Sequence, residues 1–229
     1  MSTEPESKSF EEQVEDIYQQ YRHKKLESRL EEIAETMEET VLQQVLAEEF
    51  LQTSIEIDQE AKEAVQDARH HLENNEYDEL NSIIDTVEKL VEDQERRVSN
   101  KIHEERISMN SMVNGMQRLN SRVERVSEAK IEAIDELLDN WDWKGHVYRG
   151  EDTSLVARKS NAAEFGRDMR RFFEEARDDI FGPYEGTPIE PIVDDLLSDD
   201  PLYLESLRDD QIEELRESDL ESYVKLSLS

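Results

Sequence analysis

Hydrophobic residues between positions 80 and 126 recur at alternating steps of four and three. The stripe consists of Leu80, Ile84, Val87, Val91, Gln94, Val98, Ile102, Glu105, Met109, Met112, Met116, Leu119, Val123 and Val126. One extra step of four, from Val98 to Ile102, predicts a local unwinding of a supercoil. Such alternation over about six heptads is typical of a coiled-coil helix. Ile131, Ile134, Leu138 and Trp141 extend the predicted helix to residue 141.

A second, less regular stripe lies upstream. It runs through Phe10, Val14, Ile17, Tyr21, Leu30, Ile33, Met37, Val41, Val45, Phe50, Ile57, Ala61, Val65, Ala68 and Leu72. After Pro5 no proline appears before Pro183, and no glycine before Gly115, so nothing in the sequence forbids very long helices. The stripe predicts a helix over about 10–73, preceded by a polar tail over 1–9.

Asn74 and Asn75 form the only turn-like dipeptide between the two stripes. Asn75 and Asp78 have the spacing of a helix-capping pair. We therefore predict helices over about 10–73 and 76–141, folded back as one antiparallel hairpin. The alternative is one unbroken helix of about 130 residues, roughly 200 Å long, which pairs with a second chain.

The charge distribution fits this hairpin. Residues 96–130 contain eight basic and four acidic side chains, whereas residues 19–53 contain four basic and eight acidic ones. In a hairpin centred on residues 74–75 these two segments lie opposite each other, and opposite charges favour that register. The same complementarity would also serve an antiparallel dimer.

The pattern changes after residue 141. Residues 142–182 form a junction rich in basic side chains, with a short strand pair expected at 146–149 and 154–158. A helix is expected next, capped by Asn161 and ended by Gly182, with Phe165, Met169, Phe172, Phe173, Ala176 and Ile180 on its apolar face. Residues 183–229 form an acidic linker with short helices expected at about 191–197, 201–207, 211–217 and 219–226, the last capped by Ser218 and Glu221. The predicted fold is all-α: a long antiparallel helical hairpin or coiled coil followed by a small, mostly helical C-terminal module.

The acidic composition bears on the salt conditions under which this fold is expected to be stable. The chain of 229 residues has a formal net charge of −32, no cysteine, and 10 lysines against 17 arginines. Self-repulsion on this scale destabilises a compact state in dilute buffer, but molar salt screens it. The composition resembles that of cytoplasmic proteins from halophilic archaea. A disordered acidic chain is disfavoured by the helical pattern, and a DNA-mimicking acidic protein is a minor alternative. No apolar run is long enough for a membrane span, and the N-terminus lacks the pattern of a secretion signal.

Candidate chemistry is sparse. The sequence has no P-loop, no Gly-rich dinucleotide turn and no HExxH motif. His70 and His71 are adjacent, so they point about 100° apart on a helix and do not converge on a metal. We expect no enzymatic activity, no cofactor, no metal and no small-molecule substrate. Gln94 and Glu105 are polar at seam positions, where they could fix register or oligomeric state; replacing Gln94 with Leu is then expected to raise stability.

Residues 144–177 hold an unusual concentration of basic side chains for so acidic a chain. The candidate partner-binding residues are Trp141, Trp143, Arg149, Arg158, Lys159, Arg170 and Arg171. The alternative is structural: the tryptophans seed a small core, and Arg170 and Arg171 pair with Glu174 and Glu175 one helical turn on. The expected function is a structural or adaptor protein that binds protein partners and self-associates. Nucleic-acid binding through 144–177 is the alternative, although such binding weakens steeply with salt.

Overall fold

A computed structural model describes residues 9–123, 128–192, 195, 202–218 and 226–227 of the chain. Within these residues the protein is all-α in class, as the sequence predicts. The helices are α1 (Phe10–Phe50), α2 (Gln59–Glu73), α3 (Tyr77–Val123), α4 (Glu128–Asn140), α5 (Lys144–Val147), α6 (Leu155–Phe181) and α8 (Asp209–Glu217). None of the described helices is both long and apolar enough to cross a membrane.

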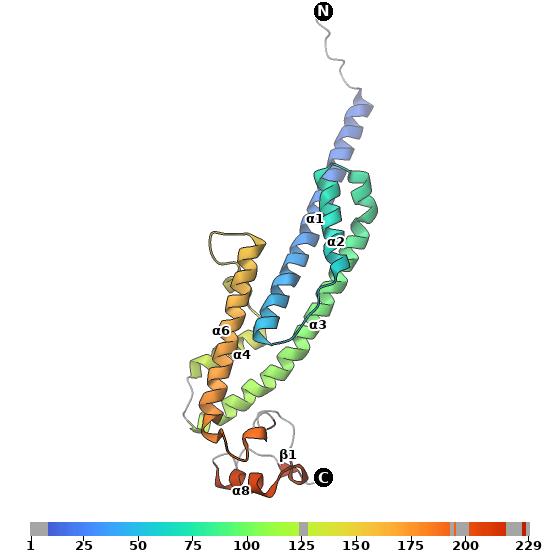
Figure 1. The fold of residues 1–229 in the computed structure, drawn as a ribbon. Coiled ribbons are helices and arrows are strands. Elements are labelled where there is room, and N and C mark those ends of the chain that lie inside the picture. The colour runs from blue at the N-terminus through green and yellow to red at the C-terminus, as the bar shows by residue number, and fades with distance from the viewer. Residues whose placement is uncertain (1–8, 124–127, 193–194, 196–201, 219–225, 228–229) are drawn as a thin grey trace, which may run out of the picture. The chain divides into compact units, whose positions relative to one another are not determined.

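The chain divides into two compact units. The first consists of Met1–Val41 and Glu56–Ser99, and the second of Leu42–Ile55 and Asn100–Ser229. Helices α1 and α3 therefore contribute their first parts to the first unit and their remaining parts to the second (Figure 1).

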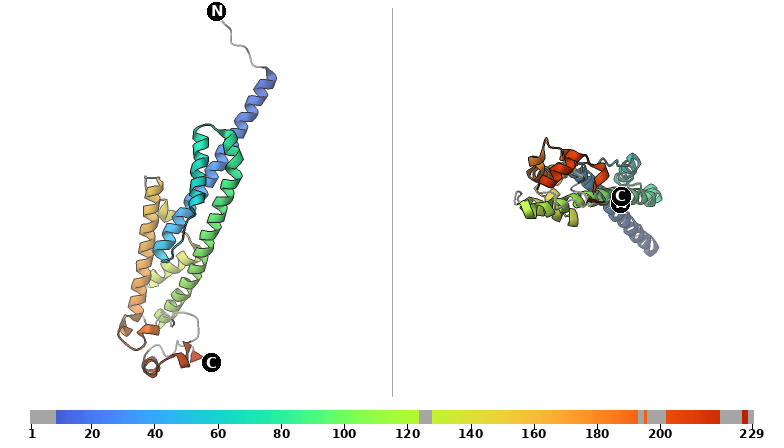
Figure 2. Two further views of the ribbon diagram at one scale, coloured as in Figure 1. Left: turned by 45° about the vertical axis from the view of Figure 1, so that its right-hand side comes forward. Right: turned by 90° about the horizontal axis from the view of Figure 1, so that it is seen from below.

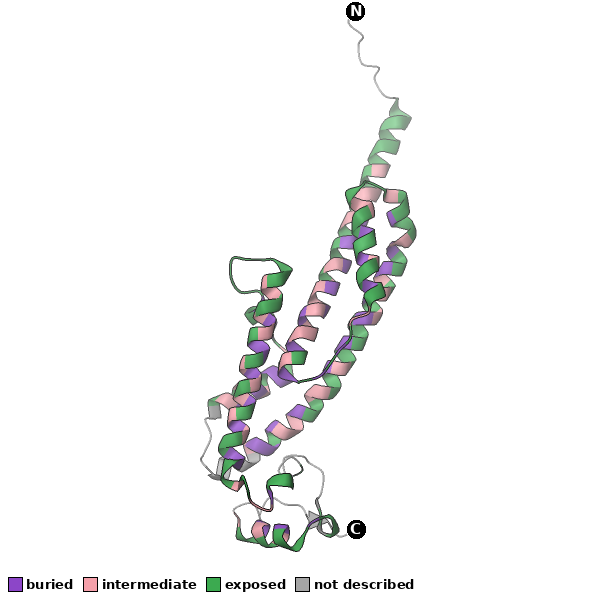
Figure 3. Cartoon of the chain, in the orientation of Figure 1, coloured by how far each residue is buried: buried purple, intermediate pink, exposed green. Residues whose placement is uncertain are grey.

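The first unit is a bundle of three helices around one apolar core. Its buried side chains are Leu26, Leu30, Ile33 and Met37 of α1, Ala61, Val65 and Ala68 of α2, and Leu80, Ile84, Val87 and Val91 of α3. Their steps of three and four place one stripe of each helix in the core, and Figure 3 shows these stripes as buried. The predicted seam of α3 is thus confirmed over this range.

The predicted reversal between the stripes is confirmed. Helix α2 ends at Glu73 and α3 begins at Tyr77, so the two helices form an antiparallel hairpin (Figures 1 and 2). Asn75 has a φ of 60°, a left-handed conformation that asparagine adopts more readily than most residues. Asn74 caps α2 through its backbone N–H, so the turn residues themselves were correctly identified.

The first arm of the hairpin is much shorter than predicted, because the helix expected over 10–73 is interrupted after Phe50. Residues 52–58 are non-helical, and Leu51, Thr53 and Ile55 are buried while the residues between them are exposed. This alternation is typical of an extended segment. Helix α2 then begins at Gln59, and the carboxylate of its N-cap residue Asp58 accepts a hydrogen bond from the backbone N–H of Glu60 at 2.9 Å.

The predicted register of charges across the seam is wrong for the same reason. After the interruption α2 runs back along the bundle, so α3 runs parallel to α1. Arg22 pairs with Asp78, and Arg29, seven residues further on, pairs with Asp85 at 2.7 Å. Residues 22–29 therefore lie against 78–85, rather than against 120–127, where the hairpin centred on residues 74–75 would place them.

The second unit has its own core, built from five helices. It includes Leu42, Leu46 and Phe50 of α1, Ile102, Met109, Val113 and Met116 of α3, Ile131, Ile134 and Leu138 of α4, Val147 of α5, and Phe165, Met169, Phe173, Ala176 and Ile180 of α6. The predicted apolar face of α6 is confirmed, with Phe172 at its half-buried edge. The side chains of Leu119, Val123 and Val126 lie outside the described part of the predicted seam.

Two predictions for the junction are wrong. Residues 144–147 form helix α5, and α6 begins at Leu155, so the expected strand pair at 146–149 and 154–158 is absent from this described segment. Ser154, rather than Asn161, caps α6: its hydroxyl accepts a hydrogen bond from the backbone N–H of Ala157. The Asn161 amide instead donates to the Val147 carbonyl at 3.0 Å. Gly182 is the C-cap, as predicted.

The C-terminal module is only partly helical. Helix α8 confirms the prediction for 211–217, whereas the predicted helix at 201–207 is replaced by strand β1 (Leu202–Tyr203) and the 3-10 turn η3 (Leu204–Ser206). Two further 3-10 turns are η1 (Gly182–Tyr184) and η2 (Glu190–Ile192). Strand β1 pairs in parallel with β2 (Leu226–Ser227). Most of the helices predicted at 191–197 and 219–226, and the Ser218–Glu221 cap, lie outside the described residues.

Candidate interaction surfaces

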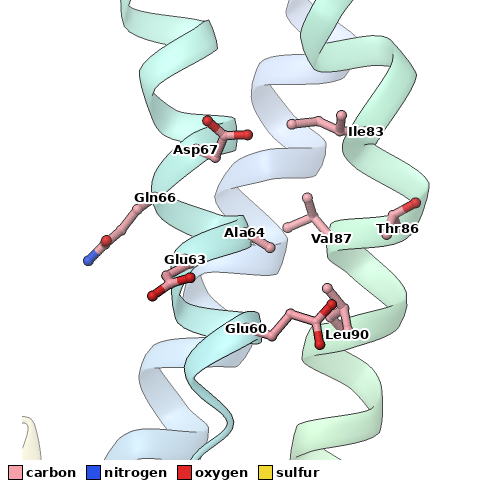
Figure 4. Close-up of a pocket in the computed structure, with 9 residues that line it drawn as sticks. All are labelled: Glu60, Glu63, Ala64, Gln66, Asp67, Ile83, Thr86, Val87 and Leu90. Atoms are coloured by element: carbon pink, nitrogen blue, oxygen red, sulfur yellow. The ribbon is translucent and has the colours of Figure 1, made fainter.

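A groove of about 640 Å³ runs between α2 and α3 in the first unit. Its apolar lining comes from Ala64 of α2 and from Ile83, Val87 and Leu90 of α3 (Figure 4). The three α3 residues are spaced by four and three, so they form one ridge along the groove. Ala64, Ile83 and Leu90 are only half-buried, so the bundle leaves part of this ridge accessible to solvent.

Carboxylates line the α2 side of this groove. Glu60, Glu63 and Asp67 are all exposed and follow one another along two turns of α2 (Figure 4). An apolar floor beside a row of carboxylates matches an amphipathic helix with basic residues flanking its apolar face. The sequence did not indicate this groove, because Glu60, Glu63 and Asp67 cannot be distinguished from the many other acidic residues.

The two candidate tryptophans occupy different environments in the second unit. Trp143 is 2 % exposed and stacks with Tyr148 at a centroid distance of 6.1 Å. Trp143 therefore lies in the core, as the structural alternative to partner binding predicted. Trp141 is half-buried in a left-handed conformation, with a φ of 49°. The Arg106 guanidinium lies over its ring at 5.2 Å, and its indole N–H has no hydrogen-bond partner among the described residues.

Arg106 has a structural role beside Trp141. Its guanidinium donates hydrogen bonds to the carbonyls of Leu138 and Asp139 at the end of α4, the latter at 2.9 Å. These are carbonyls that a helix end leaves without partners. Burial lowers the pKa of Arg106, and the nearby Asp139 carboxylate partly offsets that effect.

Most of the candidate basic residues have acidic or aromatic partners within the second unit. Arg149 pairs with Glu164 at 2.9 Å, and Arg158 lies 4.7 Å from the Tyr148 ring. Lys159 is exposed, and none of the described residues forms an ion pair with it.

The two pairs predicted within α6 are present. Arg170 bonds to Glu174 at 2.7 Å, and Arg171 contacts Glu175 at 3.8 Å and Asp168 at 3.0 Å. Lys130 also donates to Glu175 and thereby lowers the pKa of that carboxyl group. Internal pairing therefore accounts for most of the basic segment.

A second crevice, of about 590 Å³, lies between α3 and α6. Met109, Met112 and Phe173 supply its apolar lining, and Arg170 and Glu174 lie beside them. Of the seven candidate residues, Arg170 lines this crevice, and there it is already paired with Glu174. The structure does not bring the seven residues together at one site.

The two polar seam residues of α3 face the interruption after α1. The Gln94 side chain is fully buried; its carbonyl accepts from the backbone N–H of Asp58 at 3.0 Å, and its amide donates to the Glu56 carbonyl at 3.3 Å. Glu105 accepts a longer hydrogen bond, of 3.4 Å, from the hydroxyl of Thr53. Both residues thus bind the extended segment, a role that their seam positions alone do not indicate.

The described residues contain no group of three or more His, Cys, Asp or Glu side chains placed to hold a metal ion. No family model, no curated protein and no solved structure matches the chain.

Proposed function

We propose that the chain is a non-enzymatic helical adaptor or structural protein that self-associates and binds other proteins within a larger assembly of a halophilic cell. The observation that carries this proposal is the α2–α3 groove, where an accessible apolar ridge runs beside three carboxylates. A fourth helix laid along α2 and α3 would cover the half-buried Ile83 and Leu90. The bundle of the first unit would then have four helices instead of three.

The occupant that fits this groove is an amphipathic helix of another protein, with apolar residues toward Ile83 and Leu90 and lysine or arginine toward Glu60 and Asp67. Apolar contacts supply affinity that persists at high salt, since salt does not screen them. The carboxylates add selectivity against acidic helices, because juxtaposed like charges oppose binding.

Replacing Ala64 with Lys is expected to weaken binding of such a helix at least about tenfold, equivalent to about 1.4 kcal/mol. The lysine stem would occupy the floor of the groove and exclude the apolar face of a partner helix. The probe is a synthetic 18-residue peptide with leucines at helical spacing and lysines elsewhere, measured by fluorescence anisotropy in about 1 M KCl.

Ala34→Lys is the matched control, because Ala34 is also a half-buried helical alanine of the first unit but does not line the groove. Its affinity for the peptide should stay within about twofold of the unaltered protein. Equal weakening by both alanine substitutions would contradict docking in the groove.

Nucleic-acid association through residues 144–177 has less support. Arg149, Arg170 and Arg171 already contact carboxylates of their own unit. Binding phosphates would require these cations to exchange partners, and such binding weakens steeply with salt.

We expect the helical content to fall as KCl is lowered from molar concentration to about 0.1 M, where the Debye length lengthens from roughly 3 to 10 Å. The reason is the repulsion among the 59 acidic side chains, only partly offset by 27 lysines and arginines. Far-ultraviolet circular dichroism measures the change directly. A spectrum that stays constant over this range would remove the halophilic part of the proposal.

A further inference from the structure

The first three turns of α1 carry an apolar stripe that no described part of the chain covers. Phe10, Val14, Ile17 and Tyr21 are 79 %, 49 %, 66 % and 69 % exposed. The α2–α3 turn reaches only the level of Arg22 and His23, where Arg22 pairs with Asp78 and His23 stacks on Tyr77. The preceding residues of α1 extend past this turn, and all of them except the half-buried Gln19 are exposed (Figure 3).

The stripe does not continue the face that α1 buries in the bundle. At about 100° per residue, the centre of the stripe lies roughly 160° around the helix from Leu26, Leu30, Ile33 and Met37. On the bundle part of α1 the corresponding outer face carries Glu31, Glu32 and Glu35, which are exposed. The apolar side chains of the extension therefore belong to a separate contact.

We propose that this stripe is a self-association surface, on which a second copy of the chain packs its own stripe in antiparallel orientation. This inference deepens the self-association in the proposed function and is independent of the α2–α3 groove. The steps of four, three and four place Phe10, Val14, Ile17 and Tyr21 at the core positions of two heptads. Antiparallel pairing puts Phe10 opposite Tyr21, and Val14 opposite Ile17, each twice by symmetry.

Charge favours the antiparallel orientation over the parallel one. Residues 11–16 contain four acidic and no basic side chains, whereas residues 22–25 contain Arg22, Lys24 and Lys25 and no acidic one. With Phe10 opposite Tyr21, Glu11 and Glu12 of one copy lie within one helical turn of Arg22 of the other, and only Glu15 and Asp16 lie beside their own counterparts. Parallel packing would align acid with acid and base with base, which is unfavourable.

The extent of the stripe also fits this pairing. The overlap ends where each α2–α3 turn begins, at the level of Tyr77, so the two bundles do not compete for the same length of α1. A seam of two heptads is short compared with interfaces of about 1,200 Å² or more. We therefore expect a weak dimer, with a dissociation constant on the order of 0.1 mM, formed best where salt screens the repulsion between copies.

Ile17→Glu is expected to weaken this dimer at least about tenfold in sedimentation equilibrium in about 2 M KCl, because the charge enters the seam twice. Ile17 is exposed in the single chain, so circular dichroism should show an unchanged fold. Gln19→Glu adds the same charge on the opposite face of the same turn and should leave dimerisation within about twofold. A monomeric unaltered chain, or equal dimerisation of both variants, would overturn the proposal.

Disulfide trapping tests the orientation, because the chain has no native cysteine. A mixture of Phe10→Cys and Tyr21→Cys chains should form the mixed disulfide, while Phe10→Cys alone should not crosslink. Crosslinking of Phe10→Cys alone would exclude the antiparallel arrangement.

The two proposed interactions can be tested separately. Ala64→Lys should dimerise normally, and Ile17→Glu should bind the leucine–lysine peptide normally, so loss of dimerisation is distinguishable from loss of peptide binding.

Discussion

Replacing Gln94 with Leu should destabilise the protein, by about 1–3 kcal/mol, although it puts an apolar residue in place of one of the two polar residues in the predicted seam of α3. Gln94 is fully buried and satisfies the backbone N–H of Asp58 and the carbonyl of Glu56. Leucine would leave these two groups without a partner at the point where the extended segment enters α2. The measurement is urea-induced unfolding in molar KCl, followed by circular dichroism.

Glu105→Leu is the comparison that isolates this effect. Glu105 is also a polar seam residue bonded to the extended segment, but its side chain is 32 % exposed and the bond from Thr53 is 3.4 Å long. Water can replace such a bond, so the free energy of unfolding should change by less than about 1 kcal/mol. If Gln94→Leu instead raised the urea midpoint, the expectation drawn from the heptad pattern alone would be correct and the structural explanation wrong.

The seam of α3, the turn at Asn74–Asn75 and the apolar face of α6 were predictable because each depends on local spacing or turn chemistry. The interruption after Phe50 was not recognised, although the alternation of Leu51, Thr53 and Ile55 is a local signal. These three positions also fit an irregular helical stripe, and no glycine or proline marks the end of α1. The sequence therefore predicted an uninterrupted helix there. This one misreading reversed the direction of α3 relative to α1.

The candidate surfaces were less predictable than the fold. The spacing of the stripe from Phe10 to Tyr21 predicts a contact within the hairpin. Spacing alone cannot show whether another helix of the same chain extends far enough to cover this stripe. The basic residues of 144–177 are conspicuous in the composition, but the sequence does not show which of them are already paired. The ion pair of Arg149 with Glu164, for example, forms only because the fold brings these two residues together. The apolar floor of the α2–α3 groove combines positions from two helices, so neither helix shows it alone.

Gly166→Ala should also destabilise the protein, by about 1–3 kcal/mol, although alanine is the better helix former by roughly 1 kcal/mol. Gly166 lies within α6, where a Cβ atom would come 2.8 Å from the Cβ of Glu49 and 3.0 Å from the carbonyl oxygen of Leu46 in α1. Alanine therefore fits only if the helices separate. Unfolding in urea at molar KCl measures the change in free energy.

The helical glycine at 145 is the control for this substitution, because a Cβ there meets no atom within 4 Å. Gly145→Ala should leave stability unchanged or raise it by up to about 1 kcal/mol. The contrast between the two alanine variants is informative because propensity acts in the same direction in both, so a difference in sign must come from the contact of α6 with α1. Stabilisation by Gly166→Ala would show that α1 and α6 are not in close contact in solution. The second unit would then lack the contact that places Arg167 of α6 at 3.1 Å from Glu49 of α1.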